Sequence, residues 1–269
     1  GESEKDFVAR LMNELELLIE KEGADTIGAM IAEPIMGAGG VVIPPKGYFE
    51  ALQPILKKHS ILLIADEVIC GFGRTGNMWG SETVNINPDM LTCAKALSSS
   101  YLPISAVLAS PEIVRGVEKQ AAELGIFSHG YTYSASPVPA AVALRTLGLM
   151  EERKIVNHVK ELAPVFSERV EKLGMYDCIG HSRSVGLIGA MEFVAKPNTR
   201  VKLDPSIKFS VKAVKLIQEE GVILRSLPHD TVGFCPPLII NEDQVHEMFD
   251  KIEKAMPRIS KLLNSYKEL

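Results

Sequence analysis

Four short apolar segments recur through the first 110 residues, with helical or loop-like segments between them. They are TIGAMIAEP (26–34), ILLIADEV (61–68), DMLTCAK (89–95) and ISAVLAS (104–110). Apolar runs of this length are typical of buried strands. Apolar residues at helical spacing predict a helix over residues 4–22, and a second helix is expected from Tyr48 to about His59. Strands that alternate with helices predict an α/β sheet, mostly parallel, with helices on both faces.

The pattern changes near residue 150. Residues 137–173 have helical periodicity with a break near Glu151. Strands are then expected at 184–194, 221–227 and 231–240, with a helix near 206–219 and a closing helix over 241–266. We place a domain boundary near residue 150, which gives a domain of residues 1–150 and a smaller α+β domain of residues 151–269.

Composition disfavours several classes of function. The 29 Lys and Arg against 34 Asp and Glu are spread along the chain, without the basic stripe that binds nucleic acid. The cysteines lack the spacing of a metal site or a disulfide framework: Cys70, Cys93, Cys178 and Cys235. No apolar run approaches the about 20 residues that span a bilayer, and the first residues lack a signal-peptide pattern. The sequence therefore predicts a soluble, cytoplasmic protein with no metal, nucleic-acid or membrane partner.

Two residues that could bind a ligand or take part in catalysis lie at the ends of predicted buried strands. Asp66 ends ILLIAD and Lys95 ends DMLTCAK, and ligands of open α/β sheets bind at the carboxyl ends of their strands. ILLIADE also resembles a Walker-B strand, but the chain has no GxxxxGK[ST] phosphate loop, which disfavours an ATPase. GFGRTG (71–76) matches a dinucleotide-binding pattern, but a segment broken by Gly, Asn and Pro follows it, so we interpret its glycines as loop residues.

A lysine at the end of a buried strand can serve as a nucleophile. Most lysines are solvated surface groups, and the spacing of Lys95 alone does not decide between the two. Desolvation lowers the pKa of a lysine and makes its amine reactive toward an aldehyde. A carboxylate at Asp66, about 4 Å from a pyridinium nitrogen, would stabilise that charge by roughly 4 kcal/mol at an effective dielectric near 20. Such a pair would make pyridoxal 5'-phosphate (PLP) an electron sink.

Five segments, in this order and at this spacing, resemble the class III aminotransferases of the omega-amino acid or amine:pyruvate type. They are IAEPIMGAGGVVIPPKGYF, IADEVICGFGRTGNMWGSE, PDMLTCAKALSSSYLPISAVLAS, SHGYTYSASP and ILRSLPHDTVGFCPPLII. The resemblance implies the fold of PLP-dependent transferases of fold type I, like aspartate aminotransferase. It also implies that residues 1–150 are part of the large PLP-binding domain and residues 151–269 the small C-terminal domain.

The resemblance assigns roles to individual residues. Asp66 would pair with the pyridine nitrogen of PLP, and Val68 would pack on the ring. Lys95 would form the Schiff base and move the proton during transfer from an amine donor to a keto acid acceptor. Thr132 would donate to the PLP phosphate across the interface of a homodimer with shared active sites. Arg225 would bind the acceptor carboxylate. Taken singly, Thr132 also fits an ordinary turn hydroxyl and Arg225 a surface charge.

Some positions depart from the family pattern. Family members that use 2-oxoglutarate with ornithine or 4-aminobutyrate have a Glu that masks the arginine equivalent to Arg225, and here that position is Ala38. This favours pyruvate as the acceptor. Ile69 stands where many relatives have Gln, Ala96 where Gly is common, and SASP replaces SGHP.

The resemblance begins after the part of the family that carries the Gly/Ser phosphate loop and the ring-stacking aromatic residue. We therefore expect this chain to be the C-terminal two-thirds of a longer protein and to bind PLP weakly alone. Two alternatives to the aminotransferase remain open. One is a PLP-dependent aminomutase, racemase or decarboxylase of the same fold, and the other is a truncated, non-catalytic homologue.

Overall fold

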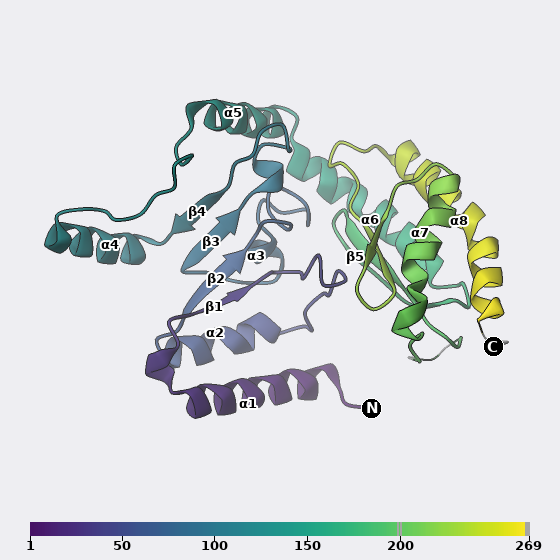
Figure 1. The fold of residues 1–269 in the computed structure, drawn as a ribbon, viewed down its shortest axis with the longest axis horizontal. Helices are drawn as coiled ribbons and strands as arrows, with labels where there is room; N and C mark the ends of the chain where they lie inside the picture. Colours follow the sequence, from purple (N-terminus) through teal and green to yellow (C-terminus); the bar gives the residue numbers. More distant parts are fainter. Residues whose placement is uncertain (198, 200, 267–269) are drawn as a thin grey trace. The chain divides into compact units, whose positions relative to one another are not determined.

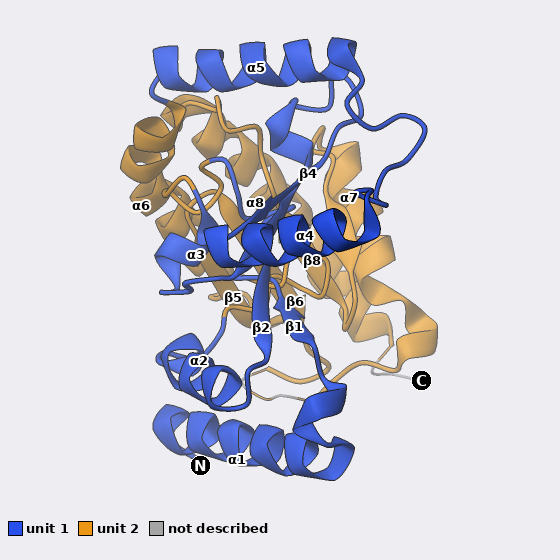
Figure 2. Cartoon of the chain, turned by 90° about the vertical axis from the view of Figure 1, so that its left-hand side faces the viewer, with its two compact units in different colours: residues 1–34, 44–72, 79–154 blue, residues 35–43, 73–78, 155–269 orange. Residues whose placement is uncertain are grey.

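The chain folds into two compact units, each described here by itself. A computed structural model describes residues 1–197, 199 and 201–266 (Figure 1). The first unit comprises residues 1–34, 44–72 and 79–154, and the second comprises residues 35–43, 73–78 and 155–269 (Figure 2). The main change of unit lies between Lys154 and Ile155, close to the boundary placed near residue 150. The sequence did not predict that the short segments 35–43 and 73–78 belong to the second unit.

The first unit is built on a four-stranded sheet in the order β1-β2-β3-β4. The strands are β1 (Ala29–Ala32), β2 (Leu62–Asp66), β3 (Met90–Cys93) and β4 (Ala106–Ala109). β1 pairs with β2 and β2 with β3 in parallel, whereas β4 is antiparallel to β3. All four predicted strands are present, each shorter than its apolar segment, because the flanking residues form loops and turns.

Helices precede, separate and follow the strands of this unit along the chain. They are α1 (Glu4–Glu22), α2 (Tyr48–Lys58), α3 (Gly80–Thr83), α4 (Pro111–Leu124) and α5 (Pro137–Glu152), with the 3-10 turns η1 (Ala24–Thr26) and η2 (Lys95–Leu97). The predicted α1 and α2 are confirmed. The Ser3 side chain caps α1 by accepting from the Asp6 N–H at 3.2 Å. Helix α4 was not predicted, although Ser110 and Pro111 form a typical N-cap and first helical residue.

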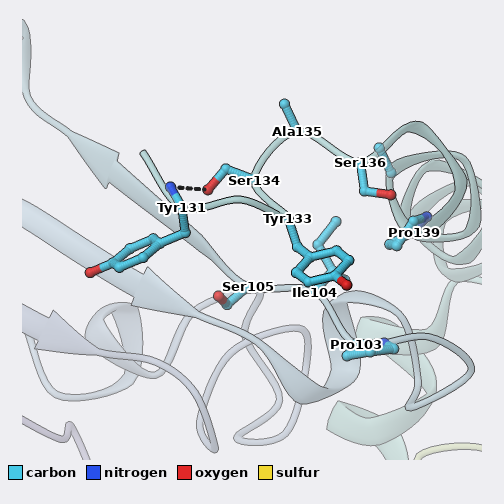
Figure 3. A pocket seen from close by; sticks show the side chains of 10 residues that line it. Pro103, Ile104, Ser105, Tyr131, Tyr133, Ser134, Ala135, Ser136 and Pro139 are labelled. Atoms are coloured by element: carbon cyan, nitrogen blue, oxygen red, sulfur yellow. Dashed lines mark hydrogen bonds between the residues drawn. The ribbon is translucent and has the colours of Figure 1, made fainter. Parts of the chain in front are cut away.

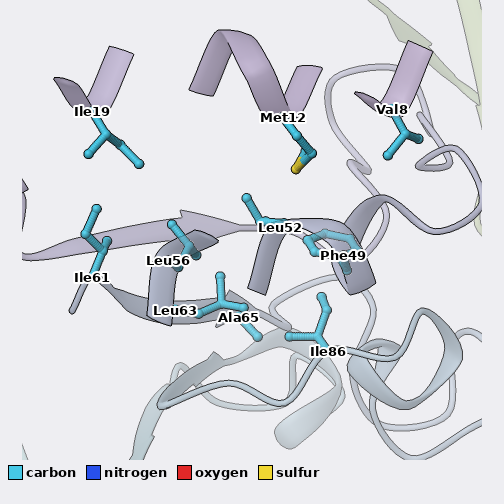
Figure 4. Close-up of a cluster of buried hydrophobic side chains, with 10 residues drawn as sticks. All are labelled: Val8, Met12, Ile19, Phe49, Leu52, Leu56, Ile61, Leu63, Ala65 and Ile86. Carbon is cyan, nitrogen blue, oxygen red and sulfur yellow. The ribbon is translucent and has the colours of Figure 1, made fainter. Parts of the chain in front are cut away.

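A core of buried side chains joins α1, α2 and β2, as Figure 4 shows. Its members recur at helical spacing on α1 and α2 and at alternate positions along β2 and the residue before it, with one more residue after α3: Val8, Met12, Ile19, Phe49, Leu52, Leu56, Ile61, Leu63, Ala65 and Ile86. Each large side chain buried here contributes about 1.5–3 kcal/mol to folding. The core thus stabilises β2, the strand that ends at Asp66.

The described residues of the second unit form a four-stranded antiparallel sheet in the order β5-β6-β8-β7, together with three α-helices. The strands are β5 (Ile179–Val185), β6 (Ile188–Phe193), β7 (Arg225–Leu227) and β8 (Thr231–Phe234). The helices are α6 (Ile155–Leu173), α7 (Phe209–Glu219) and α8 (Glu242–Ser265), with the 3-10 turn η3 (Pro205–Ile207). The predicted helices near 206–219 and 241–266 are confirmed as α7 and α8.

The single strand predicted at residues 184–194 is wrong. The chain turns at Gly186, which has a φ of +58°, and forms a hairpin of β5 and β6. Only a residue that tolerates the left-handed region fits this turn easily. The strands predicted at 221–227 and 231–240 are also shorter, because only 225–227 and 231–234 pair within the sheet.

Aromatic side chains fill the core of the second unit. Phe249 of α8 lies 5.6 Å from Phe166 of α6 and 5.5 Å from Phe234 of β8, measured between ring centroids. All three residues are fully buried. The Phe166–Phe249 pair is edge-to-face, and such a contact adds about 0.5–1.5 kcal/mol beyond the area it buries. The sheet and the two helices therefore share one continuous core.

Candidate active site

Asp66 lies at the carboxyl end of β2, where its backbone pairs with Thr92 of β3. Its half-buried carboxylate accepts, on Oδ1, the Val68 N–H at 3.0 Å and the Thr92 hydroxyl at 3.4 Å. No residue that the structure describes forms a hydrogen bond or ion pair with Oδ2. One carboxylate oxygen is thus fixed and the other is open to a ligand.

Lys95 follows the neighbouring parallel strand and begins η2, three residues after Thr92. The structure therefore brings Lys95, Asp66 and Val68 to the same edge of the sheet, as predicted from the ends of the two strands. The expectation that Lys95 is desolvated is wrong for this chain, because its side chain is exposed. The strand ends at Cys93, and Lys95 already belongs to a turn.

The backbone around Lys95 is strained. Lys95 has a φ of +46°, and Ser99 and Ser100 have φ values of +49° and +63°. A non-glycine residue in this region costs about 1–3 kcal/mol, and such residues cluster at functional sites. No described residue binds the Lys95 ammonium group through a hydrogen bond or ion pair, so the amine is available to a ligand.

Glu67 is a site residue that the sequence reasoning overlooked. Its side chain is 1% exposed. Oε2 accepts the Gly80 N–H at 2.8 Å, and Oε1 accepts the Ser81 N–H at 2.6 Å and the Ser81 hydroxyl at 2.5 Å. Burial raises the pKa of Glu67, and these three hydrogen bonds oppose that rise. The signal in the sequence was the second acid directly after a buried strand.

The backbone of Glu67 is also fixed. Its N–H donates to the Thr92 carbonyl at 2.9 Å, and its carbonyl accepts the Gly71 N–H at 2.9 Å. A Cβ at Gly71 would lie 2.9 Å from this same carbonyl oxygen, so the turn has no room for a side chain there. Glu67 thus holds the turn that places Asp66 and Val68.

Thr132 is exposed in a turn of residues 132–135 that precedes α5. A pocket of about 710 Å³ lies beside this turn, and Figure 3 shows the Tyr131 and Tyr133 side chains above Ser105 and Pro103. The Ser134 hydroxyl accepts the Tyr131 N–H at 3.2 Å. Thr132 is not among the lining residues, which are Pro103, Ile104, Ser105, Tyr131, Tyr133, Ser134, Ala135, Ser136, Pro139 and Ala140.

Arg225 belongs to the second unit and is described within it. It is the exposed first residue of β7 and pairs with Gly233 of β8. Ala38 is exposed in the 35–43 segment of the same unit.

The described residues contain no group of three or more His, Cys, Asp or Glu side chains that could hold a metal ion. Within the same part of the chain, no helix combines the length and apolar character of a membrane span.

Comparison with known proteins places these features in a family. The model of the family described as aminotransferase class III matches residues 1–256. An uncharacterized aminotransferase of Sinorhizobium fredii is 43% identical over 258 residues, which cover 95% of this chain. The chloroplastic gamma aminobutyrate transaminase 3 of Solanum lycopersicum is 46% identical over 256 residues, again 95% of this chain.

Solved structures agree with these sequence relatives. A transaminase with L-alanine superimposes with a TM-score of 0.94 at 46% identity, covering 98% of this chain and 62% of its own. The omega transaminase from Pseudomonas jessenii in complex with PMP has a TM-score of 0.94 at 40% identity, covering 98% of this chain and 58% of its own.

The chain spans about half the length of the curated relatives it matches, namely 55% of the Sinorhizobium protein and 49% of the tomato protein.

Proposed function

Because this chain belongs to the class III aminotransferases, which are PLP-dependent enzymes of fold type I, we propose that it supplies the lysine-bearing part of an amine or omega-amino acid transaminase. The amino group would pass from a primary amine or omega-amino acid to a keto acid, with pyruvate as the preferred acceptor. The observation that carries this proposal is the pair of Asp66, with one open carboxylate oxygen, and Lys95, with a strained backbone and an unpaired amine. Asp66 ends β2, and Lys95 follows the end of the adjacent parallel strand β3 by two residues.

These residues fit the cofactor of the family. PLP, when bound, supplies an electron sink for the carbon that gains or loses the amino group. Asp66 Oδ2 would accept a hydrogen bond from the pyridinium nitrogen, while Oδ1 stays fixed by Val68 and Thr92. A preorganised carboxylate of this kind stabilises a positive charge without reorganising. Val68, in the turn after β2, would pack against the ring.

Lys95 would hold the cofactor covalently and then act as the acid and base of the reaction. Its Nζ would hold and move the proton that leaves the donor carbon, so a single group would serve both directions of transfer. The left-handed backbone of Lys95 directs this side chain from a turn rather than from the strand itself. An exposed amine in this chain is consistent with a site that other parts of the protein cover.

Two residues would complete the substrate and phosphate contacts. Thr132 would donate its hydroxyl to the cofactor phosphate across the interface of a homodimer with shared active sites. Arg225 would bind the acceptor carboxylate through a bidentate pair. Both side chains are exposed in this chain and available for such contacts.

Ala38 supports pyruvate as the acceptor. In this position it offers no carboxylate to mask Arg225, so the arginine must move aside when a donor without a carboxylate binds. One solved relative is a transaminase with L-alanine, the amino acid that corresponds to pyruvate. The gamma aminobutyrate transaminases among the relatives support an omega-amino acid as a donor. We also propose a cytoplasmic location.

The test is a panel of donors and acceptors, assayed on the longest natural chain that contains this sequence. We expect transfer to pyruvate from 4-aminobutyrate or a primary amine, and exclusive use of 2-oxoglutarate would refute the acceptor. Incubation with donor alone should leave pyridoxamine phosphate, which a decarboxylase or racemase would not do. A protein that gives no half-reaction with any donor would support the non-catalytic alternative.

A further inference from the structure

The segment 35–43, called here the acceptor loop, is closed on itself and anchored by one arginine. Met36 and Val42 exchange two backbone hydrogen bonds of 3.1 and 2.9 Å, which close the loop around Ala38. Arg183 of β5 then donates to two successive loop carbonyls. Its Nε lies 2.8 Å from the Val41 oxygen, and its Nη2 lies 2.5 Å from the Gly40 oxygen.

Arg183 is itself held from the opposite side. Its Nη1 donates to Glu192 Oε2 at 3.0 Å and lies 2.8 Å from His181 Nδ1. Glu192 also pairs with Lys202. The Arg183 side chain is only 11% exposed, and contacts on both sides fix the position of its guanidinium group. The planar guanidinium group of an arginine has several N–H donors and can make all these contacts at once, which the single ammonium group of a lysine cannot do.

The acceptor loop lies on the face of the sheet that carries Arg225. Arg183 pairs with Ala190, Ala190 with Gly233, and Gly233 with Arg225, so the two arginines occupy one row across the four strands. Residues paired in this way point to the same face. Their backbones are three strand spacings apart, about 14 Å.

Two further contacts fix this assignment of faces. A Cβ built on Gly40 would lie 3.6 Å from Arg183 Nη2 and 3.9 Å from Thr231 Oγ1. Thr231 stands two residues before Gly233 on β8 and so shares its face. The opposite face packs on a helix, because a Cβ on Gly189 would meet the Phe166 ring at 3.2 Å.

We propose that Arg183 is a positioning residue that fixes the acceptor loop over the Arg225 face of the sheet and thereby tunes the affinity for the keto-acid carboxylate. This rests on the proposed function of Arg225. Ala38 has no polar side chain, so the backbone of the loop defines this side of the carboxylate site. Arg183 acts through the loop rather than through direct contact with the substrate, because its backbone lies about 14 Å from that of Arg225.

The experiment compares Arg183→Lys and Arg183→Gln with the control Arg258→Lys in the longest natural chain. Arg258 is a half-exposed arginine of α8 that pairs with Glu219 and Glu220. Amide hydrogen exchange is measured first, without cofactor or substrate. We expect exchange in residues 36–42 to rise at least about 10-fold in both Arg183 variants, with the control unchanged. The lysine variant keeps the charge and also tests whether geometry matters.

Steady-state kinetics then test the effect on the acceptor. The KM for pyruvate should rise about 10-fold in both variants, while the half-reaction of a primary amine without a carboxylate changes less than about 2-fold. Unchanged exchange in the loop would overturn the anchoring, and an equal loss with the amine would overturn the link to the carboxylate. If the unmutated protein does not transaminate, the proposed function fails, but the role of Arg183 can still be tested. The Kd of pyruvate, measured by calorimetry, then replaces the KM as the quantity compared between the variants.

Discussion

The carboxylate oxygen Oε1 of Glu67 accepts two hydrogen bonds from one residue, Ser81, through its backbone N–H at 2.6 Å and its hydroxyl at 2.5 Å. The contact ties the turn after β2 to the first turn of α3. It is buried, and burial raises the pKa of Glu67 above its ordinary value of 4.5. The folded state therefore binds this proton more tightly than the unfolded state does.

The pH dependence of stability follows from this direction. The contribution of Glu67 to the free energy of unfolding is fully present below about pH 4.5 and is lost as the pH rises through the pKa of the folded state. Glu67→Gln does not titrate, and its amide group opposes an N–H donor, which costs about 1–3 kcal/mol. We expect the wild type to be more stable than Glu67→Gln, with the difference shrinking as the pH rises.

Urea unfolding of both proteins between about pH 4.5 and 8.5 measures this difference. The control is Glu118→Gln, because Glu118 is an exposed acid of α4 that forms no hydrogen bond or ion pair with any described residue. The free energy of unfolding of this control should differ from that of the wild type by an amount that does not shrink as the pH rises. A difference in the free energy of unfolding between wild type and Glu67→Gln that stays constant or widens as the pH rises would contradict a raised pKa of Glu67.

Two substitutions of Lys95 separate its role in catalysis from the cost in stability of its left-handed backbone. We expect Lys95→Ala to lower activity about 10³–10⁴-fold, because it removes both the covalent attachment and the acid–base group. Lys95→Gly should be equally inactive but about 1 kcal/mol more stable than Lys95→Ala, since the φ of +46° disfavours a Cβ.

Activity assays, absorbance near 420 nm with PLP and urea unfolding give the three readouts. Lys119→Ala is the matched control, because Lys119 is an exposed lysine on α4. Borohydride reduction followed by peptide mass spectrometry should label Lys95 and no other lysine. Retention of full activity in Lys95→Ala would remove the basis of the proposed function.

Gly186→Ala should destabilise the second unit strongly. A Cβ at Gly186 would lie 2.5 Å from the Arg74 carbonyl oxygen, and the φ is +58°. Strain and backbone displacement together cost about 3 kcal/mol. Gly221 has a φ of +92° but no atom within 4 Å of its Cβ position, so Gly221→Ala should cost only about 1–2 kcal/mol. Urea unfolding measures the two losses in free energy of unfolding. Equal losses in Gly186→Ala and Gly221→Ala would show that the close approach of the Arg74 backbone to Gly186 has no effect on stability.

Local patterns predicted the elements that carry the chemistry. Helix α1 follows from its cap and from apolar spacing, and the strands before Asp66 and Lys95 follow from their apolar runs. The parallel pairing of β2 and β3 brings those two residues to one edge, as expected. The family comparison confirms the fold and the aminotransferase class.

The features that were missed depend on partners distant in sequence. The burial of Glu67 requires the N–H groups of Gly80 and Ser81, which no pattern around residue 67 reveals. The hairpin at Gly186 depends on the backbone at Arg74. Lys95 is exposed because the strand ends two residues before it, and alternation along a strand says nothing about a turn.

The interleaving of the two units restricts how this protein can be rearranged during evolution. The chain passes from one unit to the other at five positions, so no single cut releases a whole unit. A recombination event that exchanged residues 155–269 alone would pair Arg183 and Gly186 with foreign versions of the acceptor loop and the 73–78 segment. Inheritance should therefore preserve both units as one block, with changes on one side of these contacts matched by changes on the other.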